Sequence, residues 1–284
     1  MIISIASGKG GTGKTTVATN LAVSLNQPVQ LLDCDVEAPN AHLFIHPAIQ
    51  RSAPVNAPVP QWVPEKCSFC KKCMEICRFG ALAVLKKDVM VFENLCHSCG
   101  GCFEVCPENA LIEKERHIGV VETGSSGKLL FAHGRLNIGQ VMVPPVIREV
   151  RANTDPEIIT IIDAPPGTSC PVIAAVNQAD VVVLVTEPTP FGLHDLKLAV
   201  ETVQVLDIPF GLVINRAGMG NDEVKDFATE NQIPVLMEIP FEKQFARIYS
   251  TGGLIAEEID GYKDKFQRLF TDLKALAGRG QGVK

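Results

Sequence analysis

Short runs of apolar residues recur along the chain, and most of them are separated by stretches with helical spacing. Near the N-terminus, runs at 2–6 and 29–32 predict two strands, with a helix between them over 15–26. Similar runs predict further strands, and helical spacing predicts helices around them. The later strands are expected at 158–162, 181–185, 210–214 and 235–237, and the helices at about 139–153, 170–178, 191–206, 220–231 and 255–276. This alternation predicts an α/β fold with a mostly parallel sheet and helices on both faces.

Two segments interrupt the alternation in the first half of the chain. Residues 47–64 contain five prolines and show little periodicity, which predicts a linker. A block rich in cysteine follows and ends near Lys114, and the α/β pattern resumes at Ile118. We therefore expect a discontinuous α/β domain formed by residues 1–60 and 116–284, with residues 61–115 inserted as a small α+β domain.

The composition narrows the classes of protein to which the chain can belong. Its 284 residues are 46% hydrophobic and 20% charged, as in ordinary globular proteins. The net charge of −6 does not favour binding to nucleic acid. The sequence shows neither a basic leader nor an apolar run of membrane-spanning length, so we expect a cytoplasmic protein that does not enter the membrane. Ten cysteines in such a protein indicate metal binding, because cytosolic thiols are kept reduced.

A glycine-rich segment between the first predicted strand and helix has the spacing G-x-x-x-x-G-K-T, from Gly8 to Thr15. Glycines allow the backbone N–H groups to turn toward phosphates, and the helix N-terminus adds a positive dipole end. We expect Lys14 to neutralise the β- and γ-phosphates and Thr15 to bind Mg²⁺. The expected phosphate-binding set is Gly8, Gly10, Gly11, Thr12, Gly13, Lys14, Thr15 and Thr16.

A second lysine in this loop, Lys9, makes the segment resemble the deviant Walker A motif of the MinD/ParA/nitrogenase iron protein superfamily. The resemblance covers roughly residues 1–45 and 118–270. It implies ATP-dependent dimerisation, with itself or with a paralogue, in which Lys9 reaches the partner's phosphates. It also implies roles for residues after later strands: Asp35 orients the attacking water, Asp163 contacts Mg²⁺ through water, and Asn215 reads adenine. Asp33 and Asn40 match further positions of this family.

The cysteine block contains the pattern C-x-x-C-x-x-C-x-x-x-C twice, beginning at Cys67 and at Cys96. This is the run of bacterial ferredoxins that hold two [4Fe–4S] clusters, in which the fourth cysteine of each run ligates the other cluster. Zinc sites also use C-x-x-C pairs, but they bring two pairs together over a longer gap. Arg78 replaces the proline expected after Cys77. The expected ligands are Cys67, Cys70, Cys73 and Cys106 for one cluster, and Cys96, Cys99, Cys102 and Cys77 for the other.

Three weaker signals leave alternatives open. Cys170 follows Asp163 at the spacing of a shared-cluster ligand in the nitrogenase iron protein, but no second such cysteine occurs between Lys114 and Asp163, so a small core or interface cysteine fits better. His97 lies between two expected ligands, where it tunes a cluster by hydrogen bonding or is an ordinary loop residue. The last predicted helix carries an apolar stripe, which favours packing on the sheet over membrane attachment. The stripe consists of Ile259, Tyr262, Phe266, Leu269, Phe270 and Leu273.

Together these features predict an ATPase that uses ATP, Mg²⁺ and two [4Fe–4S] clusters. The leading hypothesis is that nucleotide-dependent dimerisation gates electron transfer through the clusters to a partner redox protein. One alternative is an ATP-dependent factor that assembles or carries iron–sulfur clusters. A second is a positioning ATPase whose ferredoxin domain senses the redox state.

Overall fold

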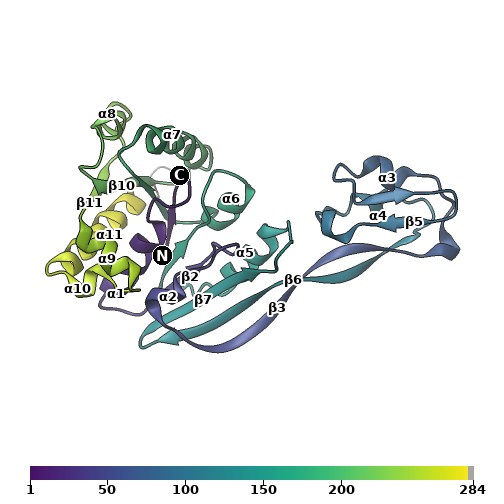
Figure 1. Ribbon diagram of the computed structural model, residues 1–284, viewed down its shortest axis with the longest axis horizontal. Coiled ribbons are helices and arrows are strands. Elements are labelled where there is room, and N and C mark those ends of the chain that lie inside the picture. The colour runs from purple at the N-terminus through teal and green to yellow at the C-terminus, as the bar shows by residue number, and fades with distance from the viewer. Residues whose placement is uncertain (281–284) are drawn as a thin grey trace.

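The computed structural model describes residues 1–280, which form a large α/β body and a small module joined by a long two-stranded ribbon (Figure 1). Within this part of the chain, the main sheet has the strand order β11-β10-β9-β1-β8-β2-β7-β6-β3. All neighbours from β11 to β7 are parallel, whereas β6 and β3 are antiparallel. The strands are β1 (Ile2–Ala6), β2 (Val29–Asp33), β3 (Ala48–Trp62), β6 (Leu111–Ser126), β7 (Leu129–Leu136), β8 (Ile159–Asp163), β9 (Val181–Thr186), β10 (Phe210–Ala217) and β11 (Val235–Pro240).

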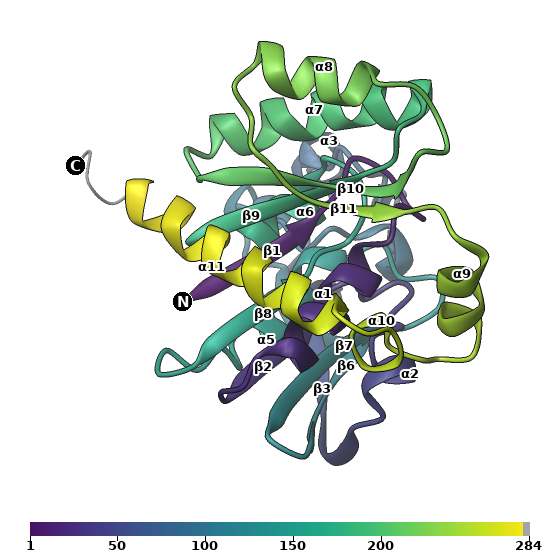
Figure 2. The same ribbon diagram turned by 90° about the vertical axis from the view of Figure 1, so that its left-hand side faces the viewer.

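Helices cover both faces of the parallel part of the sheet (Figure 2). One apolar layer packs beneath α5 (Val143–Arg151), α6 (Cys170–Val176), α7 (Pro190–Val205) and α8 (Glu223–Glu230). The opposite layer packs beneath α1 (Lys14–Ser24), α9 (Lys243–Ser250), α10 (Ile255–Glu258) and α11 (Tyr262–Gly280). Because strands such as β9 are buried on both faces, they read as continuous apolar runs in the sequence. The predicted α/β class is confirmed.

The prediction of a linker over 47–64 is wrong. These residues contain β3, a strand of 15 residues at the edge of the sheet that pairs with β6 from Ala48 to Trp62. Proline has no N–H to donate, but every second residue of an edge strand directs its N–H away from the partner strand. Pro54, Pro58 and Pro60 are separated by even numbers of residues, so all three can take that outward position. The buried residues between them alternate with exposed ones, and this period of two was the overlooked signal.

Other element predictions differ in detail. β6, β7 and α9 were not predicted, and the helix expected over 139–153 is the shorter α5. The helix expected over 255–276 is divided into α10 and α11, with a break at Gly261, whose φ of 78° is in the left-handed region. The apolar stripe is confirmed as a packing face, because Phe266 and Leu273 are fully buried on the layer that also contains α1.

The small module at the far end of the ribbon is built from two similar halves. Each half has a short 3₁₀ turn (Pro64–Lys66 or Glu93–Leu95) followed by a short helix, α3 (Lys72–Ile76) or α4 (Gly101–Glu104). A second sheet pairs β4 (Leu82–Val84) with β5 (Val89–Val91). The end of β3 pairs with the start of β6 in the same way, so Trp62 faces Leu111 as Val91 faces Leu82. The positions 61 and 115, expected as domain boundaries, lie within β3 and β6.

Candidate nucleotide site and cysteine cavities

The phosphate-binding segment lies between the end of β1 and the start of α1, at the carboxyl edge of the parallel strands. Gly13 has a φ of 95°, and a side chain there would collide with the amide of Asn215, so both the conformation and the space require glycine. Asn215 Nδ2 donates a hydrogen bond of 2.7 Å to the Thr12 carbonyl. The end of β10 therefore supports the loop. Here Asn215 contacts the loop itself, and its reading of adenine stays a prediction.

The structure brings the expected Mg²⁺ residues together. Thr15 Oγ1 donates a hydrogen bond of 2.6 Å to Asp163 Oδ2, while Asp163 Oδ1 is buried and has no hydrogen-bond partner in the described chain. Burial raises the pKa of Asp163 to about 7, against the lowering effect of the bond from Thr15. Burial also lowers the pKa of Lys14, although nearby carboxylates oppose this. A buried carboxylate oxygen without a partner beside a hydroxyl suits a bound cation.

Asp33 organises the segment that follows β2. It lies opposite Asp163 on the neighbouring strand, and burial followed by the charge of Asp163 raises its pKa well above the usual value. Its carboxylate accepts backbone N–H groups from Asp35 at 3.1 Å and from Asn40 and Ala41 at 3.0 Å each. The half-buried Asp35 faces the Lys14 charge, although burial, the larger effect, raises its pKa. Asp33 is thus a structural anchor of the loop that carries Asp35.

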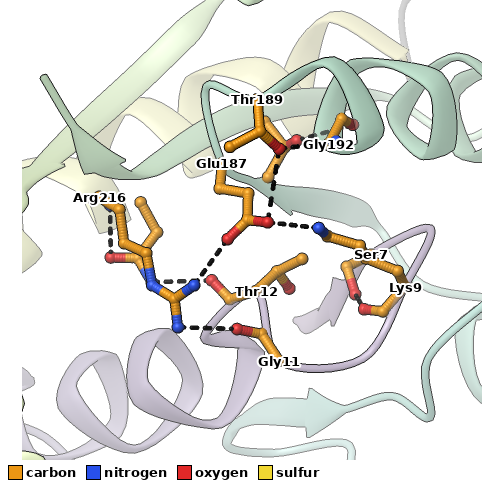
Figure 3. Close-up of polar contacts among 10 residues, drawn as sticks. Ser7, Lys9, Gly11, Thr12, Glu187, Thr189, Gly192 and Arg216 are labelled. Atoms are coloured by element: carbon orange, nitrogen blue, oxygen red, sulfur yellow. Dashed lines mark hydrogen bonds and ion pairs between the residues drawn. The ribbon is translucent and has the colours of Figure 1, made fainter. Parts of the chain in front are cut away.

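Lys9 contacts Glu187, and Glu187 also contacts Arg216; the sequence did not single out either of these two residues (Figure 3). Its ammonium group forms an ion pair with Glu187 Oε1, and Arg216 Nη1 donates to Glu187 Oε2 at 2.8 Å. Glu187 directly follows β9, whose neighbour in the sheet is β1, and Arg216 lies at the end of β10. Burial alone would raise the pKa of Glu187, but Lys9 and Arg216 hold it below its usual value.

Two cavities in the small module are each lined by one expected set of four cysteines. The first is lined by Cys67, Cys70, Cys73 and Cys106, with Trp62 and Phe69 among the other residues. The second is lined by Cys77, Cys96, Cys99 and Cys102. In each set the fourth cysteine comes from the other run, as the sequence predicted. His97 stacks on Phe79 at the second cavity, with ring centroids 3.8 Å apart.

The backbone around the cavities repeats together with the cysteines. Backbone N–H groups donate to sulfur atoms at equivalent positions: Phe69 to Cys67 and Ser98 to Cys96 at 3.4 Å, Ala81 to Cys77 at 3.3 Å, and Ala110 to Cys106 at 3.2 Å. The left-handed residues recur too, since Phe69, Lys71 and Gly80 correspond to Ser98, Gly100 and Asn109. Each half therefore turns its chain around a cavity in the same way.

Three findings qualify the other metal and membrane expectations. Across residues 1–280, no group of three or more His, Cys, Asp or Glu side chains is arranged to hold a single metal ion. In the same part of the chain, no helix combines the length and apolarity needed to cross a membrane. Cys170 is exposed at the start of α6, so the interpretation of it as a core cysteine is wrong.

A chain of side-chain contacts links the segment after Asp33 to the ribbon. α2 (His42–Ile45) begins just after the two N–H groups that Asp33 binds. His42 packs edge-on against His133 of β7, with ring centroids 5.1 Å apart, and His133 Nε2 lies 2.9 Å from Glu122 Oε2 of β6. Because β6 also reaches the cysteine module, these contacts connect the segment after Asp33 to a strand that leads to the module.

Comparison with known families agrees with this geometry. The model of the CobQ/CobB/MinD/ParA nucleotide-binding domain matches residues 3–255. The chain belongs to this family. The match supports a nucleotide-binding P-loop fold for the body.

Individual relatives of this family member give further context. An uncharacterized protein of Methanocaldococcus jannaschii is 31% identical over 260 residues, which cover 89% of this chain and 90% of that protein. An iron–sulfur cluster carrier protein of the same organism is 23% identical over 225 residues, or 76% of this chain and 60% of the carrier. Among solved structures, the septum site-determining protein MinD of Pyrococcus horikoshii, complexed with Mg-ADP, has a TM-score of 0.57 at 19% identity, covering 98% of each chain. That likeness establishes the shared fold.

Glu187 and Arg216 are the site residues that the sequence interpretation missed. Both lie at the carboxyl ends of predicted strands, where ligands bind in parallel α/β sheets. That rule singles out such positions in advance, but it does not show that Glu187 binds both Arg216 and Lys9.

Proposed function

We propose that this protein is an ATPase in which nucleotide-dependent dimerisation gates electron transfer through two [4Fe–4S] clusters to a partner redox protein. The observation that carries the proposal is the pair of cavities, each lined by four cysteines. They lie at the end of a ribbon whose strands extend the nucleotide-binding sheet. The partner is expected to be recognised by the small module, and the dimer forms with a second copy or a paralogue.

The nucleotide half uses residues that lie together. Lys14 neutralises phosphate charge, and the hydrogen-bonded pair of Thr15 and the buried Asp163 would hold Mg²⁺. Asp35 orients the water that attacks the γ-phosphate. Lys9 acts across the dimer on the partner's phosphates. These roles are those that the family resemblance implies.

The cysteine half fits four-iron clusters better than single ions. The corners of a [4Fe–4S] cluster bind different thiolates, so its ligands surround a cavity and do not converge on one point. When bound, such clusters supply one-electron redox chemistry. The four N–H donors to sulfur stabilise thiolate charge, and hydrogen bonds of this kind set cluster potentials. The second cavity is also lined by Pro58 and Pro60 of β3, so this cluster site is nearer to the ATPase body.

Coupling between the halves is supported by the contacts from Asp33 through α2, His42 and His133 to Glu122. A γ-phosphate that moves the loop after β2 would displace α2, whose His42 packs on His133 of β7, and His133 in turn contacts Glu122 of β6, one of the two strands that lead to the module. Gating then follows from a change in ribbon geometry, which alters the access of a redox partner to the clusters.

The similarity to an iron–sulfur cluster carrier favours a second candidate, an ATP-dependent cluster carrier. The two candidates differ in cluster lability. A carrier gives up its clusters to an apo-protein, whereas an electron-transfer protein retains them through many redox cycles.

An anaerobic EPR redox titration of the purified protein, with and without MgATP, tests the proposal. We expect two [4Fe–4S]⁺ signals whose midpoint potentials shift with MgATP. Unshifted potentials together with unchanged oligomeric state would contradict gating. Rapid transfer of iron and sulfide to an apo-ferredoxin would favour the carrier instead.

Removal of one ligand tests the cluster assignment. We expect Cys70→Ala to lower the iron content from about eight to about four atoms per chain, because it opens one of two four-iron sites. Cys170→Ala is the matched control and should leave iron content unchanged, since Cys170 lies away from both cavities. Iron analysis and the EPR signal of each variant report the result. Loss of iron in Cys170→Ala with full iron in Cys70→Ala would overturn the assignment.

A further inference from the structure

One buried carboxylate, Glu187, joins two cations from different parts of the nucleotide site (Figure 3). Its side chain is 8% exposed, and its two oxygens bind Lys9 and Arg216 separately. Arg216 Nη2 also donates to the carbonyl of Gly11 at 3.3 Å. The carboxylate therefore ties the phosphate-binding loop to the end of β10.

The contact between Lys9 and Glu187 competes with the role proposed for Lys9 in a dimer. A lysine that neutralises a partner's phosphates cannot at the same time neutralise a carboxylate of its own chain. We propose that Glu187 holds Lys9 within its own chain in the nucleotide-free monomer and thereby opposes dimerisation. Lys9 then exchanges this carboxylate for the phosphates of a nucleotide bound to a second copy. This inference rests on the proposed function, because it requires a dimer that depends on Lys9.

Arg216 makes the exchange reversible. Removing one partner from a buried ion pair is costly, because it leaves an uncompensated charge. Here Arg216 remains on Oε2 when Lys9 leaves Oε1, so Glu187 is never without a cation. The partly exposed Lys9 can therefore move without leaving a lone charge behind.

The local backbone fixes both partners of Lys9. Glu187 follows β9 and precedes Pro188, and Thr189 Oγ1 accepts the N–H of Gly192 at 3.0 Å to begin α7. Arg216 has a φ of 54°, and its N–H donates to Asn215 Oδ1 at 2.9 Å. A left-handed arginine is strained, and such strain is held in place by surrounding contacts. Glu187 and Arg216 are thus rigid, whereas Lys9 has a long, flexible side chain.

The inference predicts opposite effects for the two rigid residues. Glu187→Gln removes the competing charge and should lower the dissociation constant of the MgATP dimer by about tenfold. Arg216→Gln leaves Lys9 as the remaining cation on Glu187, so this variant should raise the dissociation constant of the dimer. Analytical ultracentrifugation of the full chain with saturating MgATP or a non-hydrolysable analogue measures both constants. Glu230→Gln, an exposed residue of α8, is the charge-matched control and should match the wild type.

A second readout follows Lys9 directly in the nucleotide-free monomer. Acylation by an N-hydroxysuccinimide ester, quantified by mass spectrometry, should modify Lys9 faster in Glu187→Gln than in the wild type, because its amine is no longer paired. Glu187→Asp keeps the charge and should slow the modification again. A purely structural role for Glu187 would change the melting temperature without this pattern.

The outcomes separate this inference from the proposed function. A wild-type chain that never dimerises with MgATP would overturn the proposed function. If the wild type dimerises and Lys9→Ala does not, a weaker or unchanged Glu187→Gln dimer would overturn the inference alone. Lys9→Ala combined with Glu187→Gln should behave as Lys9→Ala, because Glu187 acts only through Lys9. If Glu187→Gln does not fold, Arg216→Gln decides: a tighter or unchanged dimer contradicts the inference.

Discussion

Two aspartates at the ends of neighbouring strands dominate the electrostatics of the nucleotide site. Asp33 and Asp163 are both fully buried and lie opposite each other in the register of β2 and β8. The Asp33 carboxylate accepts hydrogen bonds from three backbone N–H groups, whereas one oxygen of Asp163 has no hydrogen-bond partner among the described residues. The first therefore shapes the loop, and the second is available to a cation.

This difference predicts proton release on nucleotide binding. Near pH 6, below its pKa of about 7, Asp163 carries a proton in the nucleotide-free protein. Mg²⁺ needs the carboxylate, so binding expels that proton and the apparent affinity for MgADP rises with pH, by up to about tenfold per unit below pH 7. Calorimetry in two buffers with different ionisation enthalpies measures the released protons.

Two variants test whether the proton released on nucleotide binding comes from Asp163. Asp163→Asn should abolish the buffer-dependent part of the heat, and Asp260→Asn, an exposed residue, should preserve it. A binding heat that is the same in both buffers for the wild type would contradict the role assigned to Asp163.

At the level of elements, the apolar stripe of the C-terminal helix α11 is explained by its packing in the fold. α11 places Phe266, Leu269 and Leu273 on the apolar layer shared with α1. The same stripe on an unpacked helix would suit a membrane surface. The burial of these residues accounts for the stripe within the fold.

Truncation of this stripe should therefore cost stability. Phe266 is completely buried, so Phe266→Ala removes a large packed ring and should lower the free energy of unfolding by about 3–5 kcal/mol. Urea unfolding followed by circular dichroism measures the loss, with the exposed Lys263→Ala as control. A loss of no more than about 0.5 kcal/mol, the size of most surface substitutions, would show that α11 packs loosely.

At the level of the whole molecule, the sheet connects two sites that lie far apart (Figure 1). Residues 48–62 and 111–126 form one uninterrupted ribbon from the body to the cysteine module, with two register shifts along it. Glu122 lies on this ribbon within the body, where His133 holds it. Any signal between the halves has this ribbon as its covalent route.

Loss of this contact should weaken the coupling and leave each half intact. Glu122→Gln keeps the shape of the side chain but removes the charge that pairs with His133. We expect normal iron content and normal MgATP binding, with a smaller MgATP-induced shift of the cluster potentials in an anaerobic titration. The control is Glu115→Gln, which changes an exposed residue that is also on β6. An undiminished shift in Glu122→Gln would remove this contact from the coupling route.

The sequence by itself determined the features that depend on local spacing. The phosphate-binding loop and both cysteine runs are short segments whose chemistry follows from the order of neighbouring residues, and the buried strands read as apolar runs because both their faces are covered. The spacing of two-cluster ferredoxins also predicted that the fourth cysteine of each run groups with the other run, and the two cavities have those linings.

Only the tertiary structure decided the features that depend on pairing between distant segments. β3 looked like a linker because its prolines are tolerated only at a sheet edge, and the edge exists only once β6 pairs with it. Lys9 and Arg216 both reach Glu187 because β9 lies between β1 and β10 in the sheet, although the three strands are far apart in the chain. Spacing along the sequence carries no record of such neighbours, since strand order is set by packing of the whole sheet.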